Sequence, residues 1–175
     1  MYFYRLAALV MGLSLLGCAS SSLTEITTKE RLVTPFAKAL KGWTLQESQR
    51  PNYWVRLWLA PGEGASNALR ISFSQQQSYE FDAFRETLDA GGRSKCHVFQ
   101  SAVKPLATKD AMLWQTLCTH GPHTAHVIHL VLQGNEGFYH IQRSWQTAQP
   151  QIVLNQWLEA LQGTYLCGEG RQACP

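Results

Sequence analysis

Four histidines recur at every third position in the second half of the chain: His120, His123, His126 and His129. Imidazole is a common ligand of zinc, nickel and copper, so this spacing suggests a metal site. Side chains on a strand alternate between its two faces, however, and His126 and His129 would therefore point in opposite directions. His120 and His123 flank a Gly-Pro turn and could form a pair, but two histidines make a weak site. We therefore expect surface and turn histidines, with no metal and no cofactor.

A cysteine near the N-terminus offers a different chemistry. The single charge of Arg5 precedes an uncharged apolar run of 11 residues, Leu6 to Leu16. Such a run is too short to span a membrane and has the length of a signal-peptide core. Its ending, Leu15-Leu16-Gly17-Cys18, resembles the lipobox of bacterial lipoproteins, whose cysteine is lipidated and becomes the first residue after cleavage. The alternative is an ordinary signal peptide that happens to be followed by a cysteine.

The lipobox resemblance implies a compartment and a division of the chain. Residues 1–17 would be the signal peptide, residues 18–34 the acylated Cys18 and a polar tether, and residues 35–175 one globular domain. The residues after the cysteine are Ala19 and Ser20, and the absence of an aspartate there favours the outer over the inner membrane. We expect a protein anchored by lipid to the periplasmic side of the bacterial envelope. Alternatively, part of the tether packs on the domain.

The other four cysteines are an even number, which favours disulfide bonds in an oxidising compartment. If the turn between two expected strands centres on Ala107, Cys96 and Cys118 face each other within disulfide reach. Cys167 and Cys174 then close a short loop. A metal site is the alternative, but the C-x6-C spacing suits it poorly and the chain has no CxxC motif.

Composition argues against several classes of function. The formal net charge is +3, or +2 once Arg5 is removed, and no lysine and arginine cluster indicates nucleic-acid binding. Asp82, Asp89 and Asp110 are the only aspartates, so carboxylates for acid–base chemistry are few. The chain also has no nucleophile elbow, phosphate loop, HExxH or paired-carboxylate motif. A non-catalytic role is therefore favoured over an enzyme.

The apolar periodicity predicts the elements that must position these residues. We expect a short helix after Thr34-Pro35, a hairpin of residues 53–59 and 69–73, a helix over 78–90 and a last helix from Pro150. Four strands lie near 95–103, 111–119, 124–132 and 138–145. The order predicts an α+β fold, in which a four-strand meander and the N-terminal hairpin form an antiparallel sheet. The helices should pack on one face of this sheet, giving a two-layer sandwich.

This order of elements, together with the lipoprotein features, is similar to the Mog1/PsbP-like group, which includes a periplasmic lipoprotein. The similarity covers residues 43–163 and implies a fold rather than an activity.

The expected strand registers leave one sheet face without helices, and that face combines tryptophan, arginine and polar residues, as binding surfaces do. One hypothesis is a binding or assembly factor that contacts another envelope protein or a cell-wall component through this face. The alternative is a periplasmic enzyme or small-ligand carrier with a site around His129 and His140. A covering loop would instead make the tryptophans ordinary packing residues. The candidate face consists of Trp54, Arg56, Trp58, Trp114, His129, His140 and Gln142.

Overall fold

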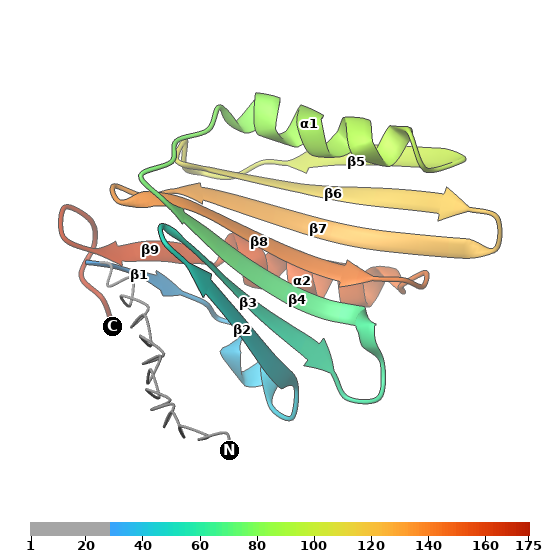
Figure 1. The fold of residues 1–175 in the computed structure, drawn as a ribbon, viewed down its shortest axis with the longest axis horizontal. Coiled ribbons are helices and arrows are strands. Elements are labelled where there is room, and N and C mark those ends of the chain that lie inside the picture. The colour runs from blue at the N-terminus through green and yellow to red at the C-terminus, as the bar shows by residue number, and fades with distance from the viewer. Residues whose placement is uncertain (1–28) are drawn as a thin grey trace, which may run out of the picture.

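The computed structural model describes residues 29–175, and its main feature is a seven-stranded antiparallel sheet (Figure 1). The expected signal peptide, Cys18 and most of the tether lie outside the described residues. The spatial order of the strands is β2-β3-β4-β8-β7-β6-β5. The strands are β2 (Thr44–Arg50), β3 (Tyr53–Ala60), β4 (Gly64–Gln75), β5 (Val98–Lys104), β6 (Ala111–His120), β7 (His123–Gln133) and β8 (Gly137–Trp145).

The α+β fold, the meander and the hairpin are confirmed. Strands β5 to β8 are consecutive neighbours, and the β3–β4 hairpin extends the same sheet because β4 pairs with β8. Two helices, α1 (Phe81–Arg93) and α2 (Gln151–Gln162), follow the expected spans closely, whereas the expected first helix is only a 3₁₀ turn, Ala37–Leu40. Strand β2 was not expected, because most of its residues are exposed polar side chains without apolar alternation.

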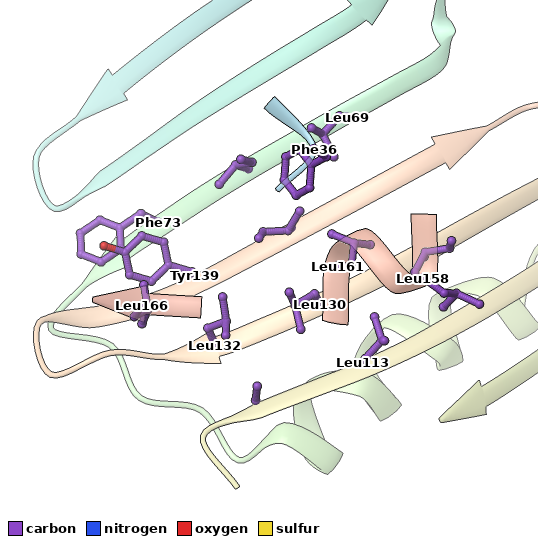
Figure 2. Close-up of a cluster of buried hydrophobic side chains, with 14 of the residues drawn as sticks. Phe36, Leu69, Phe73, Leu113, Leu130, Leu132, Tyr139, Leu158, Leu161 and Leu166 are labelled. Atoms are coloured by element: carbon purple, nitrogen blue, oxygen red, sulfur yellow. The ribbon is translucent and has the colours of Figure 1, made fainter. Parts of the chain in front are cut away.

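The helices pack against opposite faces of the sheet, so the prediction of helices on one face is not confirmed. On α1, Phe81 and Phe84 pack against a cluster that includes Trp114. Leu158 and Leu161 of α2 pack into the larger core with Leu113, the residue that precedes Trp114 (Figure 2). Consecutive strand residues point to opposite faces. We call the two sides the α1 face and the α2 face.

Burial on both faces is visible in β7, where five consecutive residues from Ile128 to Leu132 are buried. A continuous buried run is typical of a strand covered on both sides, whereas a half-exposed strand alternates. In Figure 1, α1 lies alongside β5 and β6, and α2 lies behind β8. At the centre of the sheet the structure therefore has a helix on each face, and the expected two-layer sandwich is not confirmed.

The ordered domain begins before residue 35, inside the segment expected to be tether. Strand β1 (Glu30–Val33) pairs antiparallel with β9 (Tyr165–Gly168) in a separate two-stranded sheet. Leu32 of β1 and Leu166 of β9 both contact the core of the α2 face, and Glu30 is buried. The end of the expected tether thus packs on the domain.

Candidate functional site

The structure divides the predicted binding face between the two sides of the sheet. In the β3–β4 register, Trp54 is opposite Phe73 and Trp58 is opposite Leu69, so both tryptophans lie on the α2 face with the core. The sequence interpretation instead placed Trp54, Arg56 and Trp58 on the face without helices, away from the core. Both alternating sets of β3 are apolar enough to be buried, so hydrophobicity alone did not decide which set faces the core. The pairing with β4 decides it.

Trp114 and His129 lie on the α1 face and are buried rather than open. The Trp114 side chain is fully buried, and its ring stacks on that of His129 with centroids 4.6 Å apart and planes at 8°. His129 Nδ1 and His140 Nε2 are 3.1 Å apart and share a hydrogen bond. Phe84 of α1 meets the His140 ring edge-on at 5.2 Å. This part of the predicted face is therefore covered by α1.

Burial keeps both imidazoles neutral. The pKa of His129 lies well below its usual 6.5, because burial disfavours the charged ring and the nearby His140 adds repulsion. Burial, with a smaller contribution from the charge of Arg70, lowers the pKa of His140 to about 4. In a neutral pair one proton lies between the two facing nitrogens, so one ring donates and the other accepts. General acid–base catalysis works best with a pKa near the working pH, so this pair is suited to packing.

Gln142 belongs to the same face as Trp114 but is only half-buried. It lies opposite His129 on one side and Arg70 on the other. Arg70 Nη2 donates a hydrogen bond to the hydroxyl of Tyr53 over 2.8 Å. These polar groups border the buried histidine pair rather than a cavity.

Trp54, Arg56 and Trp58 come together on the α2 face, in a groove with a volume of about 270 Å³. Trp54 and Trp58 are half-buried, whereas Arg56 is exposed. The guanidinium of Arg56 lies 5.1 Å from the Trp54 ring centroid, and its Nε is 2.6 Å from Glu47 Oε1. We call this hollow the β1 groove, because β1 supplies its other wall. The groove is lined by Glu30, Arg31, Leu32, Thr34, Trp54, Arg56, Trp58, Ile71 and Tyr139.

A second cavity, of about 230 Å³, lies on the same face between β5, β6, β7 and the start of α2. Its walls include the side chains of Gln100, Gln115 and Gln151, which no sequence motif singled out. His126 also lines it, away from the other three histidines of the expected run. Because no lining residue forms a recognisable pattern along the chain, only the strand pairing could have revealed this cavity.

Both predicted disulfides are confirmed. Cys96 bonds to Cys118 with Cα atoms 5.4 Å apart, and Cys167 bonds to Cys174 with Cα atoms 5.0 Å apart. The register behind the first prediction was wrong, because the strand partner of Cys118 is Phe99. Cys96 reaches Cys118 from the segment that precedes β5.

The other histidines do not form a larger cluster. The ring of His120 packs on that of His97, with centroids 4.4 Å apart. Within residues 29–175, no group of three or more histidine, cysteine, aspartate or glutamate side chains is placed to hold a metal ion. None of the helices described for this part of the chain is long and apolar enough to cross a membrane.

Neither the protein-family models nor the curated proteins include a match to this chain.

Proposed function

We propose that this protein is a non-catalytic binding or assembly factor of the bacterial envelope, anchored by lipid on Cys18 to the periplasmic side, most simply of the outer membrane. Its partner is a segment of another envelope protein, held in the β1 groove. The observation that carries the proposal is the concentration of Trp54, Trp58 and Arg56 in one hollow. Tryptophan and arginine dominate the energetics of protein interfaces, because they combine large apolar area with polar groups.

The surroundings of the groove support a peptide-like partner. Leu45 on β2 lies directly opposite Trp58 and is 45% exposed, so apolar surface continues from the groove to the edge of the sheet. Arg31 and Arg56 place guanidinium groups at the rim, and Arg56 also pairs with the exposed Glu47. An extended segment with an apolar anchor and an acidic side chain would match this pattern.

The enzyme alternative at His129 and His140 has less support, because the two rings are neutral and hydrogen-bonded to each other beneath α1. A ligand-carrier function at His129 and His140 has less support for the same reason, because α1 covers both rings. We therefore propose the β1 groove, and not the predicted open face, as the binding site.

Photo-crosslinking in cells tests the groove with a matched control. Leu45 and Gln46 are neighbours on β2, both exposed, and point to opposite faces of the sheet. A photoreactive residue at position 45 should give a defined crosslinked envelope protein, and the same residue at position 46 should not. Arg56→Ala should weaken the crosslink at 45, while an exposed substitution of this kind changes stability by no more than about 0.5 kcal/mol. Equal products at both positions, or none at position 45, would contradict the proposal.

A further inference from the structure

The cavity at the other end of the α2 face has walls unlike those of the β1 groove. Strand pairing places Gln100, Leu117 and His126 in one row across β5, β6 and β7. The next row on this face contains Gln115 and Ile128. Gln149, just before α2, and Gln151 and Leu154 in the first turn of α2 form the remaining wall of the cavity.

The polar groups of this cavity carry no formal charge. Four of its lining residues are glutamines, and none is a carboxylate, a lysine or an arginine. Burial lowers the pKa of His126 below its usual 6.5, so this ring is neutral at neutral pH. Its Nδ1 atom is buried without a hydrogen-bond partner among the described residues. A buried polar atom without a partner is costly, so a turn of the imidazole ring that brings Nδ1 to a ligand in the cavity would remove that cost.

The mixture of groups restricts the ligand. Each glutamine amide both donates and accepts hydrogen bonds, and so does each hydroxyl of a sugar. Ala102 and Leu117 supply apolar surface for the C–H groups of a ring. A charged ligand would lose its hydration without finding an opposite charge, which is unfavourable. The volume of about 230 Å³ lies below the roughly 300–1,000 Å³ of sites for drug-sized ligands, and suits a single ring.

We propose that this cavity, formed by Gln100, Gln115, His126 and Gln151, binds one uncharged sugar ring. We call it the glutamine pocket. It shares no lining residue with the β1 groove, so the two sites can be tested separately.

The test is an NMR titration of the secreted full chain carrying Cys18→Ser, with glucose and N-acetylglucosamine as neutral probes and glucuronate as the charged one. We expect saturable shifts at the backbone amides of residues 100, 115, 126 and 151 with a neutral sugar. Glucuronate should bind at least about tenfold more weakly, since even about 1.4 kcal/mol of desolvation cost corresponds to that factor.

Variants then assign the effect to the glutamines. Gln115→Leu keeps the approximate size and removes the amide, and should lower the affinity about tenfold. Gln100→Leu, at an exposed position, gives a second variant that does not depend on buried packing. Gln46→Leu, on β2 and away from the pocket, should bind the sugar like the parent chain.

The inference is overturned if neither neutral sugar gives saturable shifts, if glucuronate binds equally well, or if both pocket variants bind like the parent chain. If no sugar binds but the crosslink at position 45 is intact, the glutamine pocket is rejected and the proposed function stands. If the sugar binds but the crosslink at position 45 is absent, the proposed function is rejected and the glutamine pocket stands.

Discussion

Arg143 shows how individual side chains are accommodated in this core. It is only 2% exposed, and its guanidinium lies 3.9 Å from the ring centroid of Trp145 and 4.7 Å from that of Trp157. It also donates hydrogen bonds to the carbonyl oxygens of Ala68 and Ser144. Burial lowers its pKa to about 9, so the group stays charged at neutral pH. Aromatic faces and carbonyl groups thus surround a buried cation in place of a contacting carboxylate.

The buried histidines make stability depend on pH. His129 and His140 are neutral in the folded protein, whereas both titrate near 6.5 when unfolded. Below 6.5 the unfolded chain therefore binds more protons than the folded chain, and stability falls as the pH decreases from about 6.5 toward about 4. His140 alone contributes up to about 3 kcal/mol of this loss. Urea unfolding at several pH values measures it.

Two variants make this measurement specific. His140→Gln should flatten the dependence, whereas His123→Gln, at an exposed residue, should leave it unchanged. The pKa of Glu30 is also lowered, but its effect begins only as the pH approaches the usual value of 4.5. Between pH 6.5 and 5, the change in stability with pH therefore comes from histidines. His126 contributes there with the same sign, and parallel curves for the parent chain and His140→Gln would refute the assignment.

At the scale of elements, the sequence indicated strands β3 to β8 and both helices, but not strands β1, β2 and β9. Strands β3, β4 and β6 to β8 carry apolar side chains at regular spacing, whereas β1 and β9 have four residues each. Four residues give no measurable periodicity. Register was harder still, because a shift of one residue exchanges the two faces of a strand. That exchange separated Trp54 and Trp58 from Trp114, and so divided the predicted site.

The N-terminal strand is held by a buried ion pair. Glu30 accepts hydrogen bonds from the backbone N–H groups of Asn135 and Glu136 in the β7–β8 turn. Arg171 Nε lies 2.6 Å from Glu30 Oε1, and Arg171 Nη2 donates to the carbonyl oxygen of Gln133. The Cys167–Cys174 disulfide closes the loop that carries Arg171. One carboxylate therefore connects β1, the β7–β8 turn and the C-terminal loop.

Glu30→Gln should detach β1 from this arrangement. Loss of the charge leaves Arg171 with only its longer contact to Asp110, at 3.9 Å, and breaking such a buried pair costs about 3 kcal/mol. Hydrogen exchange should then accelerate selectively in β1 and β9. Glu169→Gln is the matched control, because Glu169 pairs with Lys29 in the same region but both side chains are 72% exposed. Equal stability of the two variants would show that Glu30 does not hold the strand.

At the scale of the whole molecule, α2 separates two hollows on one face of the sheet. The β1 groove lies beside β1, and the glutamine pocket lies between the start of α2 and strands β5 to β7. A lipid on Cys18 would be connected to β1 by residues 19–29. Eleven residues span at most about 40 Å, so the proposed anchor would keep the β1 groove near the membrane surface.

The anchor itself gives the last prediction. Cys18→Ser removes the sulfur that would carry the lipid, so the protein should move from the membrane fraction to the soluble periplasm, or accumulate as an unprocessed precursor. The fold of the domain should persist, because the contacts described for residues 29–175 hold it together.

Mass spectrometry of the parent protein should find an acylated Cys18 as the first residue. If the groove acts on a partner at the membrane, the crosslink at position 45 should weaken in Cys18→Ser even though the groove is intact. Any other mature N-terminus, or a Cys18→Ser protein that is processed normally and stays at the membrane, would reject the lipid anchor.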